Sequence, residues 1–346
     1  MKNSAKSHPK KRSVVRFLLI SLGSLFLVAI GLIAWFVIPL FSEPDMTELP
    51  AYHPFKSSEA KEKYLNYYDT RATQWPVAAE SKYVDTSYGE TFVRICGSPG
   101  APVFVLLPSV GASSLIWLPN VKTLSEHFRV YAIDNIYDVG RSVYTRAIRN
   151  SDDLVGWLDE VLNVLELSDD INLMGLSFGG WITSQYAIRF PHRLRKIVLA
   201  APVATVLPLP FEWAWRGILS AIPNRYVMKK VMVAWAFQDL VRKEDEVSRE
   251  TVETIIDDAL MGLRCFKFKM PVTPTVLEDQ EWRSIRVPTL FLVGEHEVIY
   301  SAHDAIHRLN TVAPHITTVI IPNASHDLTI VQADMFNERV IEFLSN

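Results

Sequence analysis

Cysteine is almost absent from this chain, since its 346 residues contain only Cys96 and Cys265. The two lie in distant segments, without the spacing of a disulfide framework. An extracytoplasmic domain could pair them, whereas isolated cysteines in a folded domain are usually buried. We therefore expect two buried free thiols, with a disulfide as the alternative.

Acidic residues are missing from the N-terminal 42 positions, because the first one is Glu43. The same stretch is basic within its first 16 residues: Lys2, Lys6, Lys10, Lys11, Arg12 and Arg16. Removing these six from the 35 basic residues leaves 29 against 38 acidic ones, so the rest of the chain is near −9. An acidic body argues against binding to nucleic acid.

Charged residues of either sign are missing from Phe17 to Phe41, a run of 25 positions. At about 1.5 Å per residue, such a helix crosses a hydrocarbon core of about 30 Å. Trp35 lies near its far end, where interface anchors are found. A cleaved signal peptide is the alternative, but its apolar region is usually about 7–15 residues long, and Phe36–Phe41 offers no cleavage site. The sequence thus predicts a single-pass cell-membrane protein with a cytoplasmic N-terminus and an extracytoplasmic body.

Internal repeats and low-complexity tracts are lacking beyond the basic leader. Hydrophobic residues make up 49% of the chain and charged ones 21%, which predicts a packed core. Four segments follow from these patterns. They are a basic leader (1–16), a transmembrane anchor (17–41), a juxtamembrane segment (42–80) that includes a helix, and a main domain (81–346) with an insertion at about 205–282.

Strand-like and helix-like runs alternate along the main domain. The predicted strands are Thr91–Cys96, Pro102–Leu107, Arg129–Asp134, Ile171–Leu176, Lys196–Ala201, Thr289–Gly294 and Thr317–Ile321. The predicted helices are Ser58–Arg71, Ser114–Ser125, Asp152–Leu167, Phe178–Phe190, Ala302–Leu309 and Val331–Leu344. Several strands are near-continuous apolar runs, as buried parallel strands are. The alternation predicts an α/β fold with a mostly parallel, doubly wound sheet.

The insertion interrupts this alternation with helical, aromatic sequence. Its only capped helix is expected to start at Ser248, with Glu250 in the first turn. We expect a helical lid over the edge of the sheet where the strands end. Its aromatic side chains either line an apolar pocket or pack the lid on the sheet: Phe211, Trp213, Trp215 and Trp235.

The most informative segment is a strand, a sharp turn and a helix. The apolar run Ile171–Leu176 leads into Gly175-Leu-Ser-Phe-Gly179, and a helix-like stretch follows from Trp181 to Phe190. A nucleophile elbow has this form, because a strained turn exposes the serine hydroxyl at the top of the sheet. Gly175 and Gly179 flank Ser177 where larger side chains would collide. The segment predicts that Ser177 is a nucleophile.

A serine nucleophile needs a base, and His326 has the best position. It follows the last apolar strand, Thr317–Ile321, and precedes the final helix. The loop between them opens at the same sheet edge as the elbow. His326 is therefore the predicted general base.

The base needs a carboxylate to orient it, and Glu297 is the predicted one. It lies three residues past the end of the strand Thr289–Gly294, and the order serine, acid, histidine suits this kind of fold. Glu295 is the nearest alternative. Asp304 belongs to the following helix, and Asp327 is too close in sequence to the histidine.

The developing oxyanion needs two backbone N–H donors. Phe178, which follows the nucleophile, supplies the first. The loop Pro108–Ser113, after the strand Pro102–Leu107, should supply the second.

With these residues in place, the chain resembles the α/β-hydrolase superfamily, and within it carboxylesterase-like serine hydrolases with a helical cap. The resemblance runs from about Tyr64 to Phe343. The segments that carry it are Ser113–Trp117, Val130–Asp134, Asp138–Ser142, the elbow, Pro288–Glu297 and Asn323–His326. It implies that Ser177, Glu297 and His326 form the catalytic triad and that Val110 is the second oxyanion donor. The chain departs from the family at Pro108-Ser109, where most relatives have His-Gly.

A second motif points to other chemistry. His303 and His307 are four residues apart on a predicted helix, as in a zinc motif, but no third ligand is apparent. We expect neither metal nor cofactor. The expected activity is that of a membrane-anchored carboxylesterase acting on small apolar esters. The alternatives are amide, thioester, carbon–carbon or peroxide chemistry on the same fold, or a non-catalytic membrane-tethered binding module. The oligomeric state does not follow from the sequence.

Overall fold

The computed structural model describes residues 31, 45–167, 169–270 and 272–346. The predicted leader lies outside these residues, and so does the predicted membrane span apart from Gly31. Among the helices of the described part, none is both long enough and apolar enough to span a bilayer.

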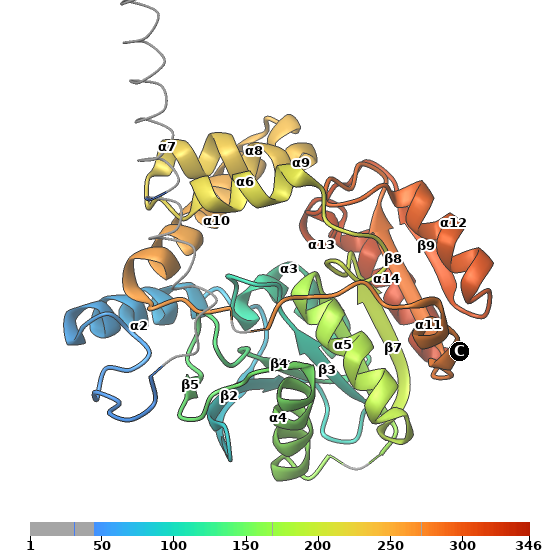
Figure 1. The fold of residues 1–346 in the computed structure, drawn as a ribbon, viewed down its shortest axis with the longest axis horizontal. Helices are drawn as coiled ribbons and strands as arrows, with labels where there is room; N and C mark the ends of the chain where they lie inside the picture. Colours follow the sequence, from blue (N-terminus) through green and yellow to red (C-terminus); the bar gives the residue numbers. More distant parts are fainter. Residues whose placement is uncertain (1–30, 32–44, 168, 271) are drawn as a thin grey trace, which may run out of the picture.

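A nine-stranded sheet organises the domain, in the order β1-β2-β4-β3-β6-β7-β8-β9, with β5 paired to β2 (Figure 1). β1 and β2 are antiparallel, and from β4 onward the neighbouring strands run parallel. The strands are β1 (Ala79–Thr86), β2 (Gly89–Cys96), β3 (Val103–Leu107), β4 (Arg129–Ile133), β5 (Val143–Tyr144), β6 (Ile171–Leu176), β7 (Leu194–Ala200), β8 (Thr289–Gly294) and β9 (Thr317–Ile321). The predicted doubly wound α/β fold is confirmed.

Helices cover both faces of the sheet and bury two apolar layers. The helices α4 (Ser151–Val164), α5 (Phe178–Arg189), α11 (Asp279–Ser284) and α12 (Ala302–Val312) contribute to one core. The helices α2 (Ser58–Ala72), α3 (Leu118–Ser125) and α14 (Ala333–Ser345) contribute to the other. Two short pieces complete these layers: the 3₁₀ turn η1 (Ser114–Trp117) and α13 (Leu328–Val331).

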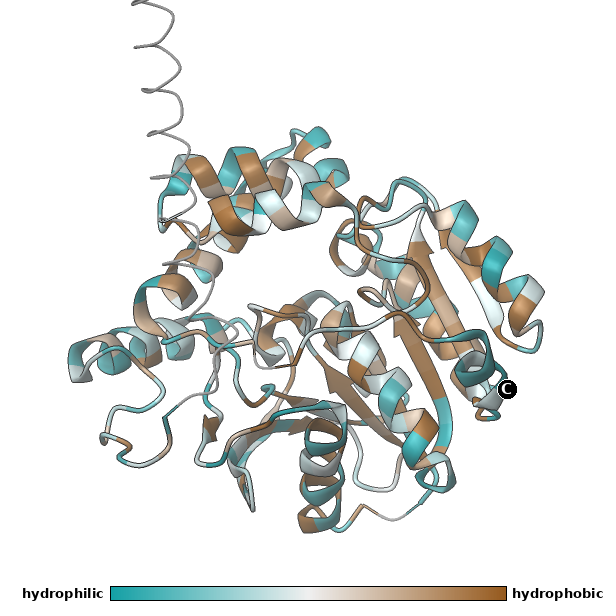
Figure 2. Ribbon diagram, in the orientation of Figure 1, coloured by the Kyte–Doolittle hydropathy of each residue, from teal (hydrophilic) through white to brown (hydrophobic). Residues whose placement is uncertain are grey.

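The apolar runs of the sequence became the central strands. Every residue of β6 and of β8 is buried, and Figure 2 shows the middle of the sheet in the colour of hydrophobic residues. Parallel strands covered on both faces need this composition, because neither face meets water. The buried strands place their C-terminal ends, and the loops that follow, at one edge.

The segment before the predicted domain boundary packs into the domain. Tyr64 and Tyr68 of α2 are buried, and α2 contacts the cap helix α10 (Glu246–Cys265). The expected boundary at residue 81 falls inside β1. Both cysteines are buried and free, as predicted.

The predicted insertion forms a helical cap between β7 and β8 (Figure 1). Besides α10 it contains α6 (Phe211–Ser220), α7 (Arg225–Val227), the π-helical η3 (Met228–Val233), α8 (Ala234–Ala236) and α9 (Gln238–Arg242). The prediction that its capped helix starts at Ser248 is wrong. The side chain of Asp245 is the N-cap and accepts a hydrogen bond from Ser248 N, so α10 begins at Glu246. Trp213 and Trp235 pack against the core.

Candidate active site

Ser177 occupies a strained turn between β6 and α5. Its backbone has φ 53° and ψ −109°, a conformation that non-glycine residues rarely adopt. A Cβ on Gly175 would lie 2.0 Å from the backbone of Gly179, and one on Gly179 would lie 2.4 Å from Leu107 O. The two glycines therefore allow the strand, the helix and β3 to approach closely enough for this turn.

The register of the parallel strands brings three loops to the same edge. The last residue of β6, Leu176, pairs with Ala200 of β7, and Ala200 pairs with Leu292 of β8. At the end of β8, Gly294 pairs with Ile321 of β9. Neighbouring strands are about 4.8 Å apart, so the loops after β6, β8 and β9 open within reach of one another.

Glu297 and His326 form a buried pair in the loops after β8 and β9. His326 Nδ1 lies 3.0 Å from Glu297 Oε2 and 3.2 Å from Oε1. The backbone N–H groups of Val298 and Ile299 donate to Glu297 Oε1 at 2.8 and 3.1 Å. The Glu297 side chain is fully shielded from solvent. These donors stabilise its buried charge. Because Nδ1 faces the carboxylate, the other ring nitrogen, Nε2, points away from it.

The pKa of His326 reflects two opposing effects. Burial lowers this pKa, but the negative charge of Glu297 and its hydrogen bond raise it, and the net result is a pKa above the ordinary value. Glu295, the alternative acid, is half exposed and accepts a hydrogen bond from Asn323 N at 3.0 Å. The geometry thus places Glu297, and not Glu295, beside the histidine.

In the described part of the chain, no hydrogen bond joins Ser177 Oγ to His326. Ser177 is almost completely buried at 4% exposure. Nucleophile–base contacts in unliganded enzymes are often long and tighten when substrate is bound.

Hydrogen bonds from the loop after β4 hold the loop that should supply the second oxyanion donor. Asn135 Nδ2 donates to Pro108 O at 3.1 Å, and Gly111 N donates to Asp138 Oδ1 at 2.9 Å. These contacts lie on either side of Val110, whose N–H is the expected donor. Proline at position 108 removes only its own N–H, and the carbonyl that it keeps is the atom used here.

A third contact holds the far end of the same loop. Asp134 Oδ1 accepts a hydrogen bond from Ser114 N at 2.7 Å, and Asp134 Oδ2 accepts one from Arg141 N at 2.8 Å. Burial raises the pKa values of both Asp134 and Asp138. Hydrogen bonds from backbone N–H groups lower these values, but the net pKa of each aspartate is raised. Sequence reasoning included this segment in the family resemblance but assigned it no role.

The cap is hydrogen-bonded to the loop that carries the histidine. Asp327, next to His326, is buried, and its Oδ2 accepts from Leu240 N of α9 at 2.9 Å. Its Oδ1 accepts from both the N–H and the hydroxyl of Ser325 at 2.9 and 3.0 Å. The same hydroxyl, which has one proton to share, also lies 3.0 Å from Ala236 O in α8.

The same cap helix contacts the loop that carries the acid. Asp239 lies 3.0 Å from His296 Nδ1, and Gln238 Nε2 donates to His296 O at 3.1 Å. Both loops are therefore fastened to α9. Sequence reasoning missed these residues because each contact spans more than 50 positions of the chain.

A small apolar cavity lies behind the oxyanion region. Its volume is about 20 Å³, and Val110 and Phe178 both line it. The other lining residues are Ile136, Tyr137, Asp138, Ile148, Leu154, Phe268, Lys269, Met270 and Val272, of which Asp138 and Lys269 are charged. The environment next to both expected donors is therefore mainly hydrophobic.

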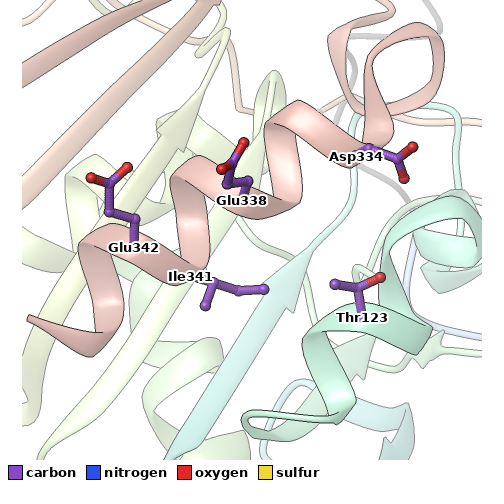
Figure 3. A pocket seen from close by; sticks show the side chains of 5 residues that line it. All are labelled: Thr123, Asp334, Glu338, Ile341 and Glu342. Carbon is purple, nitrogen blue, oxygen red and sulfur yellow. The ribbon is translucent and has the colours of Figure 1, made fainter.

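Two other features of the surface do not belong to this site. A hollow between α3 and α14, shown in Figure 3, is lined by three carboxylates, Thr123 and Ile341, and none of these lining residues is a histidine. His303 and His307 are exposed on α12. Among the described residues, no group of three or more potential ligands is placed to hold a metal ion.

Comparison with known proteins identifies the family. A model of the alpha/beta hydrolase fold matches residues 102–333, which is more than half of the chain. This chain belongs to the α/β-hydrolase family. The uncharacterized carboxylesterase nap of Bacillus subtilis is 32% identical over 284 residues, which cover 82% of this chain and 92% of that protein. Carboxylesterase YbfK of the same organism is 30% identical over 291 residues, or 84% of this chain and 96% of that one.

Solved structures agree with this assignment. The naproxen esterase of Bacillus subtilis superposes with a TM-score of 0.75 at 30% identity, covering 83% of this chain and 99% of its own. The α/β hydrolase described here is thus a carboxylesterase-like hydrolase.

Proposed function

We propose that this α/β hydrolase is a serine carboxylesterase in which Ser177, His326 and Glu297 form the triad. The observation that carries the proposal is the buried His326–Glu297 pair at the sheet edge where Ser177 occupies a strained turn. Its similarity to carboxylesterases supports ester hydrolysis over other reactions of the fold.

In the first half of the reaction, Ser177 Oγ attacks the ester carbonyl carbon and its proton passes to His326 Nε2. Glu297 holds Nδ1 in the protonated tautomer and stabilises the imidazolium. The N–H groups of Phe178 and Val110 bind the oxyanion. The intermediate then collapses: the bond to the alcohol oxygen breaks, and that oxygen takes the proton from His326. The acyl group remains on Ser177 Oγ.

In the second half, water attacks the acyl carbon and His326 takes its proton. The tetrahedral intermediate then breaks the bond to Ser177 Oγ, and the proton returns to the serine. The products are a carboxylic acid and the free enzyme. This sequence uses only side chains and backbone N–H groups of the protein.

The hydrophobic surroundings of the oxyanion region support esters with an apolar acyl or alcohol part. The cavity against Val110 and Phe178 is lined mainly by aliphatic and aromatic side chains. Apolar walls exclude water and strengthen the hydrogen bonds to the developing charge.

We also propose that residues 17–41 anchor the protein in the cell membrane, with the hydrolase domain outside. The basis is the sequence alone: 25 positions without charge after a basic leader. A cleaved signal peptide would instead give a secreted enzyme with a new N-terminus near residue 40.

A panel of p-nitrophenyl esters of increasing acyl length tests the esterase proposal. The wild-type enzyme should hydrolyse them, and Ser177→Ala should lower kcat on the order of 10⁶-fold. Ser184→Ala, which removes a buried hydroxyl of α5 that donates only to Trp181 O, is the control and should keep most of the activity. Hydrolysis of amides, thioesters or carbon–carbon substrates in place of esters would refute ester specificity. No turnover of any of these would favour a binding module.

A further inference from the structure

Large apolar side chains remain exposed mainly on the cap. The described part of the chain has seven exposed large apolar residues, and five of them lie between residues 211 and 247. Phe211 is 80% exposed, Tyr226 71% and Ile222 46%. Single exposed apolar residues are ordinary on a protein surface, whereas a concentration of them marks an interaction site.

The geometry of α6 shows which of its faces is unpartnered. At 3.6 residues per turn, Phe211, Trp215 and Ile218 share one side of the helix, and Trp213 and Ser220 share the opposite side. Trp213 packs against the core and Ser220 is the only buried residue of α6. Figure 2 shows broad hydrophobic bands on α6, which lies at the outside of the cap. We call the outward side chains, with the exposed ones that follow, the cap patch: Phe211, Trp215, Ile218, Leu219, Ile222 and Tyr226.

The N-terminal segment joins the domain beside this patch. The ring of Phe55 lies 4.4 Å from that of Phe266, and Lys56 N donates to Cys265 O at 2.8 Å. These contacts are at the C-terminal end of α10, which is a cap helix. The chain that arrives from the proposed membrane anchor therefore meets the domain at the cap.

The same end of α10 contacts the C-terminal part of the cap patch. Arg264 donates to Pro223 O at 3.3 Å, and Arg225 pairs with Asp257 at 2.9 Å. Only 14 residues separate position 41 from the buried Phe55. Even fully extended, at about 3.4 Å per residue, they reach less than about 50 Å. The domain would thus stay close to a bilayer, with the cap nearest to the tether.

We propose that the cap patch docks on the surface of a lipid bilayer. This inference rests on the proposed membrane location, and it adds a second, independent membrane contact. Tryptophan and other aromatic side chains favour the membrane interface, where one end is apolar and the other hydrated.

The size and charge of the patch favour lipid over a second copy of the chain. A stable protein interface needs about 20–30 residues a side, far more than these side chains supply. Lys230 is exposed next to the patch, and so are Arg225, which also pairs with Glu253 and Asp257, and Lys229, which also pairs with Glu253. Basic side chains beside an apolar helix face are typical of helices that lie in the membrane interface, where they meet anionic headgroups.

Vesicle binding by a form lacking residues 1–41 tests the proposal without the anchor. This form should fold, since the match to the naproxen esterase covers 99% of that protein with 83% of this chain. The probe is a vesicle of phosphatidylcholine with a minor fraction of phosphatidylglycerol. The truncated enzyme should sediment with the vesicles. The double variant Ile222→Ser, Tyr226→Ser should bind the vesicles at least about tenfold more weakly, because two fewer apolar side chains move from water into the bilayer on binding.

The matched control replaces the two exposed apolar residues outside the cap, Val164→Ser and Tyr83→Ser. Their exposures, 49% and 46%, are similar to that of Ile222. This control should bind vesicles like the unaltered truncated form, and both variants should keep kcat/KM for a short soluble ester and unfold cooperatively.

Four outcomes would overturn the proposal. The first two are a failure of the truncated enzyme to bind vesicles and an equal weakening of vesicle binding by both double variants. The other two are a dimer that only the cap substitutions dissociate and a raised KM of the cap variant for the soluble ester. The dimer would show that the patch contacts a second copy, and the raised KM that it lines the substrate entrance. Failure of the anchor itself would be seen separately, as release of the full-length protein from membranes.

Discussion

At the scale of single residues, the site depends on a carboxylate that has no contact with solvent. Glu297 accepts hydrogen bonds from two backbone N–H groups and faces His326 Nδ1. An ionised carboxylate is stable in such a position because each oxygen has a partner. Its charge then decides the protonation of the histidine.

The activity should depend on pH through His326. The base must be neutral to accept a proton, and its pKa is raised above the ordinary 6.5. Activity is therefore lost as the pH falls through a value above 6.5. In Glu297→Gln the two raising effects of Glu297 are removed, while burial, which lowers the pKa, and the smaller raising effect of Asp327 remain. The acidic limb of a kcat/KM profile should move to lower pH in this variant, and a limb that stays or moves upward would contradict the assignment of His326 and Glu297.

Two neighbouring glutamates offer a matched comparison of rates. Glu297→Gln should lower kcat by roughly 10⁴-fold, since an amide favours the wrong tautomer of the histidine. Glu295→Gln should change kcat little, because Glu295 is half exposed and binds Asn323 N instead. Initial rates of hydrolysis of one p-nitrophenyl ester by the two variants measure this difference. The reverse ranking would make Glu295 the orienting acid.

The sequence predicted some of these residues and not others for a physical reason. Ser177, Glu297 and His326 each follow closely on the end of a strand with an apolar run, so the strand pattern alone brings them to one edge. Asp138 and Asp327 act through contacts with Gly111 and Leu240, which are 27 and 87 positions away. Only the folded chain reveals such contacts.

At the scale of elements, buried strands were predictable and exposed ones were not. The predicted bounds of β6, β8 and β9 agree with the structure, because their apolar runs have clear ends. β1 was missed: it is an edge strand whose residues are nearly all exposed, and its sequence is polar. The predicted start of α10 is wrong because the sequence analysis took Ser248 as the start, whereas the structure shows that the side chain of Asp245 accepts a hydrogen bond from Ser248 N.

The loop that carries Val110 should depend on its anchors. Asp138→Asn replaces an acceptor of Gly111 N with an amide that can turn a donor toward it. Displacing an oxyanion donor should lower kcat by about 10- to 100-fold, with little change in KM, since the oxyanion forms only during the reaction. Steady-state kinetics on a short ester measure both constants. Asp85→Asn, an exposed position on β1, is the control. A higher KM with unchanged kcat would show that Asp138 acts on substrate binding instead.

At the scale of the whole molecule, the hydrolase domain includes the segment that was expected to be a juxtamembrane linker. Phe55, Tyr64 and Tyr68 are buried in the core that also contains residues of the cap. Removing residues 42–80 would therefore expose apolar surface of this core.

Truncation should separate the membrane contact from the chemistry. A protein that lacks residues 1–41 should keep at most the reversible contact of the cap patch and be washed from membranes by dilution, with kcat for a short soluble ester unchanged, because no residue of the proposed triad is removed. The full-length protein should remain with membranes in high salt and be cleaved by protease added outside intact cells. Recovery of full-length protein in the medium with a new N-terminus near residue 40 would show a cleaved signal peptide. Protection from external protease until lysis would show the opposite orientation.

The central claim is that Ser177 is the nucleophile of this carboxylesterase-like hydrolase. Labelling with a fluorophosphonate, followed by mass spectrometry of the digested protein, tests it most directly, because the reagent phosphonylates a serine that a neighbouring base activates. We predict one adduct, on the peptide that contains Ser177, and no adduct in Ser177→Ala. We also predict strongly reduced labelling in His326→Ala. An adduct on another residue, or equal labelling of Ser177→Ala, would contradict the account.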